Sequence, residues 1–317
     1  MVFDLTKKKI WVAGHKGMVG SALAGQLTGI GSEILTVSSS ELDLRDQSAT
    51  RKWLKANKPE AIIIAAAKVG GIWANNIYPT SFLYDNLMIE ANIIEAAAKI
   101  GVEKLMLLGT GCIYPKVTEQ PVQESSLLSG PLEPTNEWYA IAKIAGIKLC
   151  QAYKQEFGLN FISAMPTNLY GPNDNFDLET SHVLPALIHK IHLAKKTNAK
   201  TVTVWGTGKP QRELMHVDDC ADALIHVMKN YDEIEPINIG TGEDMSIQFI
   251  AELVSQVIGW NGELVYDTSK PDGTLRKVLS VDKLRKLGWQ HKIAPKEGIK
   301  QVYSWFLGNE KEIISTS

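Results

Sequence analysis

The sequence lacks most of what secreted, membrane-spanning and nucleic-acid-binding proteins need. Only three of its 317 residues are cysteines, and Cys112, Cys150 and Cys220 form no metal-ligand spacing. This composition favours a reducing, cytoplasmic compartment and predicts no metal site. No uncharged apolar stretch approaches the ~20 residues of a membrane helix, and the apolar run before Gly14 is too short for a signal peptide. A formal net charge of −2 disfavours a general binder of nucleic acids or membrane surfaces.

Short apolar runs alternate with helical patterns through the first half of the chain. The runs, which we interpret as buried strands, are residues 10–13, 33–37, 61–67, 104–109 and 160–165. The segments between them that favour helices are residues 18–26, 48–56, 81–100 and 139–157. This alternation predicts βαβ units and a doubly wound, Rossmann-type parallel sheet in an α/β protein.

The regular alternation of strand and helix patterns ends near Asn168. We next expect a helix over 182–196, a strand over 201–205, a helix that begins near His216 and a strand over 236–240. After Ser246 we expect a helix, a strand and a Pro/Gly-rich connector. A chain of this length suits one composite unit or two domains. We predict a dinucleotide-binding domain of residues 1–169 and 217–240, and a smaller C-terminal α/β lobe of residues 170–216 and 241–317.

A glycine-rich loop joins the first predicted strand to the first predicted helix. Glycines in this context let the backbone approach a pyrophosphate, which the free N–H groups of the helix then bind. The spacing is G-x-x-G-x-x-G, which departs from the usual G-x-G-x-x-G, and a glycine-rich turn without a ligand is the alternative. The candidate cofactor residues here are Gly14, His15, Lys16, Gly17, Met18, Val19 and Gly20.

The end of the second predicted strand indicates which nicotinamide cofactor the loop would hold. Sites for NAD commonly place an acidic residue there, but this chain has none before Glu41. Lys16, Ser38 and Ser39 can instead hold a 2′-phosphate, which favours NADPH, unless the serines only cap a turn. Asp43 either touches the adenine ring or caps a turn.

Tyr139 and Lys143 stand four residues apart in a predicted helix and therefore share one face. A nearby ammonium favours the phenolate, so we expect Lys143 to lower the pKa of Tyr139. Such a phenol can donate a proton to an oxygen that becomes negative during hydride transfer. The alternative is an interfacial ring beside a solvated amine.

These features and several longer motifs resemble the extended short-chain dehydrogenases/reductases and, within them, the GDP-L-fucose synthase family. The resemblance covers about residues 9–307 and implies NADPH, a homodimer built on a helix bundle, and one site for both epimerisation and reduction of a GDP-linked 4-keto-6-deoxy sugar. The motifs that carry it are residues 14–20, 110–116, 132–139, 165–172, 181–183, 204–206 and 270–274.

The resemblance implies a role for each catalytic candidate. Cys112 is expected to act as the base and His182 as the acid in epimerisation at C3 and C5, since a thiol and an imidazole suit proton transfer near neutral pH. Tyr139 would protonate the C4 oxygen, Lys143 would hold the nicotinamide ribose, and Thr110 would hydrogen-bond the same oxygen. A buried cysteine and a histidine that only starts a helix are the alternatives.

The remaining matches are expected to bind ligands. Ordinary packing and surface charge are the alternative for these residues, and Pro166 can simply end a strand. The cofactor would be lined by Leu108, Gly109, Gly111, Lys143, Pro166, Thr167, Asn168, Leu169 and His182, and the GDP-sugar would contact Lys190, Trp205, Arg212 and Asp272.

Five positions depart from the family pattern and leave the exact sugar open. Gly111 removes a hydroxyl, Trp138 places a large ring beside Tyr139, and Lys16, Ser39 and Lys190 stand where arginines are expected.

Three other interpretations are a GDP-colitose synthase, a reductase without epimerase activity and an NADPH-binding regulator. The presence of both Cys112 and His182 disfavours a reductase without epimerase activity. The presence of Tyr139 and Lys143 disfavours a regulator that only binds NADPH. A 4,6-dehydratase is also disfavoured, because Gly and Cys follow Thr110 where that class has Asp and Glu.

Overall fold

The computed structural model describes residues 2–178, 180–270 and 272–315. Pro271, part of the predicted connector, lies outside these residues. Six parallel strands form the main sheet in the order β2-β1-β3-β4-β5-β9. They are β1 (Lys9–Ala13), β2 (Glu33–Leu35), β3 (Ala61–Ile64), β4 (Lys104–Leu108), β5 (Phe161–Pro166) and β9 (Ile237–Ile239). The predicted doubly wound α/β sheet is confirmed, and every residue of β3, β4 and β5 is buried, as apolar runs covered on both faces require.

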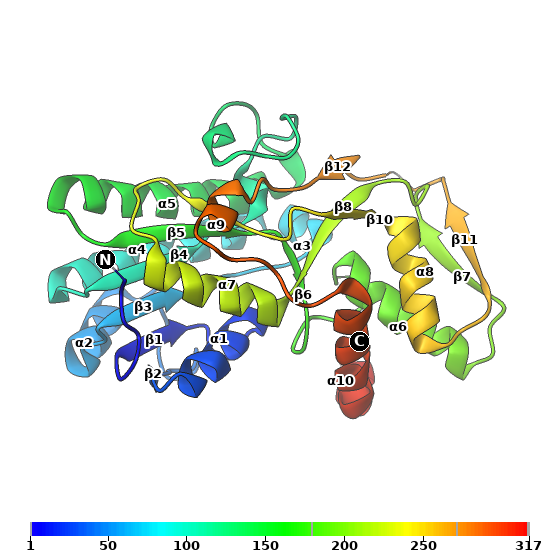
Figure 1. The fold of residues 1–317 in the computed structure, drawn as a ribbon, viewed down its shortest axis with the longest axis horizontal. Coiled ribbons are helices and arrows are strands. Elements are labelled where there is room, and N and C mark those ends of the chain that lie inside the picture. Colours follow the sequence, from blue (N-terminus) through cyan, green and yellow to red (C-terminus); the bar gives the residue numbers. More distant parts are fainter. Residues whose placement is uncertain (1, 179, 271, 316–317) are drawn as a thin grey trace.

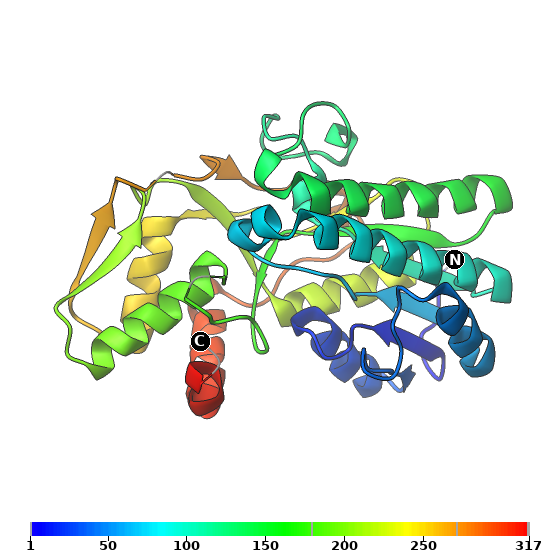
Figure 2. The same cartoon turned by 180° about the vertical axis from the view of Figure 1, so that it is seen from behind.

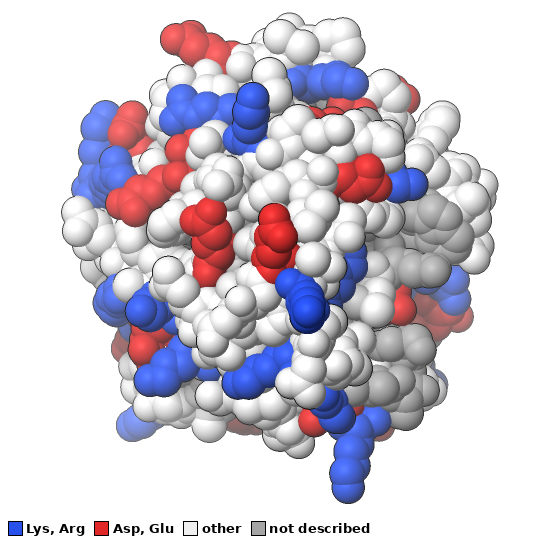
Figure 3. Space-filling model, turned by 90° about the vertical axis from the view of Figure 1, so that its right-hand side faces the viewer, with Lys and Arg blue, Asp and Glu red and all other residues white. Residues whose placement is uncertain are grey.

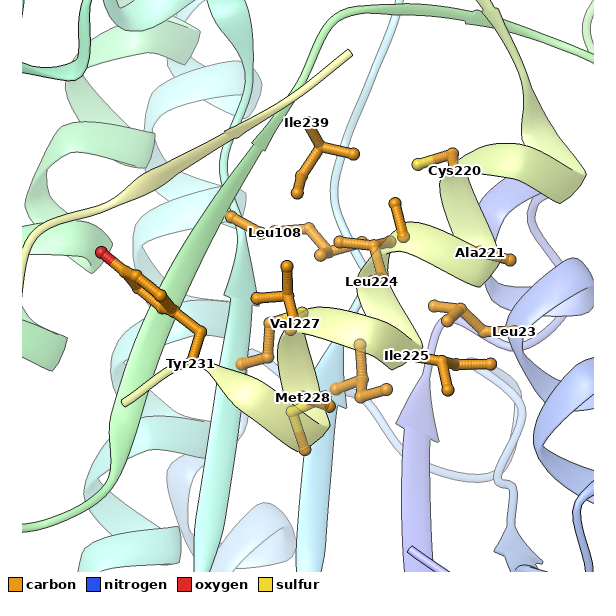
Figure 4. Packing of buried hydrophobic residues seen from close by; sticks show 14 of the residues in the cluster. Leu23, Leu108, Cys220, Ala221, Leu224, Ile225, Val227, Met228, Tyr231 and Ile239 are labelled. Atoms are coloured by element: carbon orange, nitrogen blue, oxygen red, sulfur yellow. The ribbon is translucent and has the colours of Figure 1, made fainter. Parts of the chain in front are cut away.

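Helices cover both faces of this sheet (Figures 1 and 2). One apolar core lies under α1 (Met18–Gly29) and α7 (Val217–Asn230), and Figure 4 shows Leu224 and Val227 of α7 close to Leu108 and Ile239 of the sheet. The core of the opposite face lies under α2 (Gln47–Asn57), α4 (Pro79–Ile100) and α5 (Glu137–Phe157). The short α3 (Ile72–Ile77) precedes α4.

The smaller lobe is built around β8 (Gln211–His216), a strand that the sequence pattern did not predict. β8 pairs with β6 (Asn168–Tyr170), β10 (Asp244–Ser246) and β12 (Arg276–Lys277), while β7 (Thr201–Trp205) pairs with β11 (Glu263–Asp267). A third apolar core joins these strands to α6 (Val183–Lys196), α8 (Ile247–Ile258) and α10 (Pro295–Ser315).

The chain crosses between the two parts more often than the predicted division allows. Val281 and Leu284, at α9 (Asp282–Lys286), and Trp289 belong to the apolar core of the larger domain. The proposed lobe of residues 241–317 therefore needs one refinement, because the segment around α9 returns to the main sheet before α10 begins.

Basic and acidic side chains are interspersed on the face at the end of the smaller lobe (Figure 3). Among the described residues, none of the helices is both long and apolar enough to span a bilayer.

Candidate active site

The loop after β1 lies where the strand order of the sheet reverses, between β1 and β3, which is where open α/β sheets bind ligands. Gly14 has φ +88°, and a Cβ there would lie 2.6 Å from the backbone nitrogen of Ala66, after β3. A Cβ on Gly20 would lie 2.1 Å from the Gly14 oxygen. Both positions require glycine because the loop packs against β3 and against the first turn of α1.

The start of α1 fits a phosphate group. Its N-cap residue, Gly17, contributes no side-chain cap, and the first turn carries no acidic residue. Lys16 and Gly17 are exposed. The free N–H groups and the positive end of the helix dipole are therefore available to an anion, with the Lys16 ammonium nearby.

The residues after β2 are held by local contacts. The Ser38 N–H and hydroxyl both donate to the Glu41 carboxylate, and these bonds lower the pKa of Glu41. Asp43 accepts hydrogen bonds from the side chain and N–H of Arg45, which lower its pKa to about 2. Ser38 and Asp43 thus act at least as turn caps, Ser39 is exposed, and cofactor contacts by these three residues remain a prediction.

Thr110 and Cys112 begin the 3-10 turn η1 (Gly111–Ile113) directly after β4. The Thr110 hydroxyl caps this turn by accepting from the Cys112 N–H at 3.3 Å. Cys112 is partly exposed, whereas Cys150 and Cys220 are buried, so Cys112 is the accessible thiol. The atom nearest to a Cβ built on Gly111 would be 3.7 Å away, so a Cβ at this position meets no clash.

Lys277, on β12, lies beside the candidate base. Its Nζ is 3.8 Å from the Cys112 sulfur. An ammonium at this distance stabilises negative charge on sulfur. Lys277 also pairs in register with Arg212 of the adjoining strand β8.

Tyr139 and Lys143 lie on α5 as predicted, with the Lys143 Nζ 5.8 Å from the centre of the Tyr139 ring. Lys143 acts to lower the pKa of Tyr139, as predicted, but burial outweighs this effect and raises the pKa. Lys143 is itself buried and donates to the Leu108 carbonyl at 2.9 Å, which fixes its ammonium at the end of β4.

His182 is the N-cap residue of α6 and is accessible to solvent. The protein atoms around its ring displace part of its hydration and lower its pKa. Within the described residues, no hydrogen bond joins His182 to Cys112 or Tyr139. The loop that precedes His182 lies against the start of α3, because a Cβ on Gly71 would lie 2.9 Å from the Thr180 oxygen.

The expected cofactor residues after β4 and β5 gather at the same edge of the sheet. Pro166 ends β5 and pairs with Ile239, and the Thr167 hydroxyl donates to the buried carboxylate of Glu213. Asn168 donates to the Glu213 carbonyl. Leu169 follows in β6, and a Cβ on Gly109 would collide with the Met165 sulfur at 2.3 Å. Packing alone therefore accounts for Gly109, and its cofactor contact stays a prediction.

The four expected GDP-sugar residues surround the loop between β11 and β12. Lys190 and Lys270 place their Nζ atoms 5.2 and 5.4 Å from the Trp205 ring, which is 63% exposed. Asp272 accepts from the N–H and hydroxyl of Thr207. Arg212 donates to the Thr274 carbonyl, and burial lowers its pKa. The site thus offers a flat ring near two cations, with a guanidinium in the next strand of the chain, β8.

Two residues of this site escaped the sequence analysis, Lys277 and Glu90. Lys277 follows the predicted connector by only a few residues, and no spacing links it to Cys112. Glu90 is a charged residue of α4, where it is 1% exposed. Its apolar neighbours Met88, Ile89 and Ala91 are the signal that could have identified it. Trp138, the unusual neighbour of Tyr139, is 42% exposed.

Comparison with known proteins agrees with this geometry. The model of the NAD dependent epimerase/dehydratase family matches residues 10–240. GDP-L-fucose synthase of Sinorhizobium fredii is 54% identical over 308 residues, which cover 97% of this chain and 98% of that protein. GDP-L-colitose synthase of Yersinia pseudotuberculosis is 39% identical, with 96% and 99% covered. The structure of a GDP-L-fucose synthetase from Naegleria fowleri bound to NADP aligns with a TM-score of 0.92 at 33% identity, over 98% of this chain and 96% of that one. The chain belongs to the NAD dependent epimerase/dehydratase family and, within it, to the GDP-L-fucose synthase family.

Proposed function

We propose that the protein converts GDP-4-keto-6-deoxy-D-mannose to GDP-L-fucose with NADPH, by epimerisation at C3 and C5 followed by reduction at C4. The observation that carries this proposal is the position of Lys277. Its Nζ contacts the Cys112 thiol, and its strand partner is Arg212. One strand pair therefore joins the candidate nucleotide-sugar residues to the candidate base.

Epimerisation needs a base and an acid on opposite faces of the sugar ring. The C4 ketone acidifies the hydrogens at C3 and C5. Cys112, as the thiolate beside the Lys277 ammonium, takes one of these protons and leaves an enolate. His182 gives a proton to the same carbon from the other face. Because the His182 pKa is lowered in the free chain, we expect negative charge on the bound substrate to favour its imidazolium.

Reduction needs a proton donor at the C4 oxygen. When bound, NADPH would supply the hydride for the new C4–H bond. Tyr139 transfers its phenol proton to the oxygen, so the ketone becomes a hydroxyl and a phenolate remains until solvent returns the proton. Lys143 stabilises that phenolate, and the Thr110 hydroxyl hydrogen-bonds the developing alkoxide. The loop of residues 14–20 holds the pyrophosphate, while Lys16, Ser38 and Ser39 hold the 2′-phosphate.

We propose a homodimer formed through α4 and α5. These two helices pack side by side, and large apolar side chains remain exposed on them: Tyr84, Trp138, Ile141 and Phe157 are 37–60% accessible. A second copy of the same pair would bury them. A solution mass of 34.9 kDa, that of one chain, would contradict this state.

Replacement of Lys277 by Met should slow epimerisation. The variant removes the ammonium that lies 3.8 Å from the Cys112 sulfur, so we expect exchange of the substrate C3 and C5 hydrogens with deuterated water to fall ~10-fold or more. The neighbouring Arg276→Met variant is the matched control, because Arg276 pairs with Asp244 instead. Equal exchange rates in the two variants would remove Lys277 from the site.

The proposed function is tested by incubation of the purified protein with NADPH and GDP-4-keto-6-deoxy-D-mannose. We expect the NADPH absorbance to fall and NMR to identify GDP-L-fucose as the product. The 3-deoxy substrate of a colitose synthase serves as the competitor. No oxidation of NADPH with the first substrate, or a clear preference for the second, would overturn the assignment.

A further inference from the structure

A buried carboxylate, Glu90, faces the lysine of the reductive site and has no part in the chemistry above. Its Oε1 lies 2.7 Å from the Lys143 Nζ, and both side chains are 2% exposed. In the described part of the chain, neither Glu90 oxygen makes a further hydrogen bond. A charged group is stable at such depth only beside an opposite charge, so the two side chains form one buried unit.

The packing of α4 against α5 leaves space for this carboxylate. Gly146 lies one turn after Lys143 on α5, and a Cβ there would lie 2.1 Å from the Glu90 Oε2. Any other residue at this position would push the carboxylate away from the ammonium. The absence of a side chain at Gly146 therefore allows the Glu90 carboxylate to lie beside the Lys143 ammonium.

The charges around the pair are few. The titratable groups that act on Glu90, Lys143 and Tyr139 are Cys150 on α5 and Cys112 in η1. Lys143 is the only described cation among them. When Tyr139 carries its phenol proton and Lys143 its ammonium charge, the Glu90 carboxylate makes the buried group neutral. Without that carboxylate the same protonation state would leave an uncompensated positive charge.

We propose that Glu90 is a positioning residue that holds Tyr139 and Lys143 in their doubly protonated form, the form that reduction of a ketone needs. The inference rests on the proposed function, in which Tyr139 gives up a proton. Burial acts to lower the pKa of Lys143, but the Glu90 carboxylate and Tyr139 together outweigh it and the pKa is raised. Glu90 also adds to the raised pKa of Tyr139, which burial dominates.

Loss of the carboxylate should release one proton from the pair at lower pH. Because the two groups interact strongly, the proton belongs to the pair and not to one atom. If Tyr139 loses the proton, the resulting phenolate has no proton to give to the substrate. If Lys143 loses it, the neutral amine no longer stabilises the phenolate that forms during reduction.

The test is the pH dependence of kcat/KM for NADPH-dependent reduction in Glu90→Gln. We expect the alkaline limb to move to lower pH by about one unit or more, the usual effect of a nearby charge. Glu95→Gln is the matched control on the same helix, since Glu95 is partly exposed and pairs with Arg51 and Lys99. Its limb should stay in place.

A second measurement needs no substrate. Tyrosinate absorbance, with Tyr139→Phe as the blank, and NMR of ¹³Cε-labelled lysine, assigned with Lys143→Met, report the two protons separately. One of them should leave at lower pH in Glu90→Gln. If neither titration moves in the folded variant, the inference is overturned even when the enzyme turns over. If Glu90→Gln does not fold, Gly146→Ala can replace it, because the added Cβ displaces the same carboxylate. A titration that moves to lower pH in Gly146→Ala supports the inference, and unchanged titrations overturn it.

Discussion

Replacement of Tyr139 by Phe should reduce the rate of C4 reduction by about 10²–10⁴-fold, the usual contribution of a positioned general acid. Hydrogen exchange at C3 and C5 should continue in this variant, because Cys112 and His182 still carry the epimerisation. The measurement compares NADPH oxidation with the uptake of deuterium into recovered substrate. The Tyr139 ring is partly buried beside Lys143, and Phe keeps that ring, so the variant removes a proton donor without creating a large cavity.

Tyr153→Phe on the same helix is the matched control for this effect. Its ring packs against Phe157 and Phe161, away from the end of β4. The control should keep both rates. Loss of exchange together with reduction in Tyr139→Phe would show that the phenol is needed before hydride transfer, and the assigned division of labour would be wrong.

The second large effect is expected at the thiol. Cys112→Ser should slow exchange of the C3 and C5 hydrogens with deuterated water by about 10²-fold or more, since a serine hydroxyl at this site gives up its proton far less readily than a thiol. Reduction of a substrate that is already epimerised should be affected much less. Unchanged exchange would remove Cys112 as the base.

Alkylation of the native protein provides the control for Cys112. Cys150 and Cys220 are buried in the two cores of the main sheet, and Figure 4 shows Cys220 among apolar side chains of α7. A thiol reagent should therefore label wild-type protein at one position and suppress its exchange activity, while folded Cys112→Ser should take up no label. Labelling of the variant would indicate that another thiol is accessible.

The fold could be predicted from the sequence because local signals and burial agree over the main sheet. β3, β4 and β5 are continuous apolar runs, and the glycines of residues 14–20 are fixed by the contact between β1, β3 and α1. In the smaller lobe the pattern predicted α6, β7, α8 and β11 but missed β8 and α10. β8 mixes Gln211, Arg212 and Glu213 with apolar residues, and α10 contains Gly298 and Gly308. Tertiary contacts explain part of this, because a Cβ on Gly298 would lie 2.3 Å from the Tyr170 hydroxyl.

The site was predicted to the extent that its residues form motifs along the chain. Tyr139 and Lys143 share a helix, and Thr110 and Cys112 share a turn, so their spacing carries the signal. Lys277 reaches Cys112 from 165 residues away, which no local pattern records. The lowering effect of Lys143 on the Tyr139 pKa was predicted because the sequence shows the nearby cation, but the larger opposing effect of burial could not be predicted from the sequence.

The central claim is that one carbonyl at sugar carbon four serves both chemistries in a single site. It is tested most directly by complete turnover of GDP-4-keto-6-deoxy-D-mannose with NADPH in deuterated water, followed by NMR of the product. The account predicts GDP-L-fucose that carries solvent deuterium at C3 and C5, with hydrogen from the cofactor at C4. A reduced sugar without deuterium at C3 and C5 would show that no enolate forms, and would contradict the account.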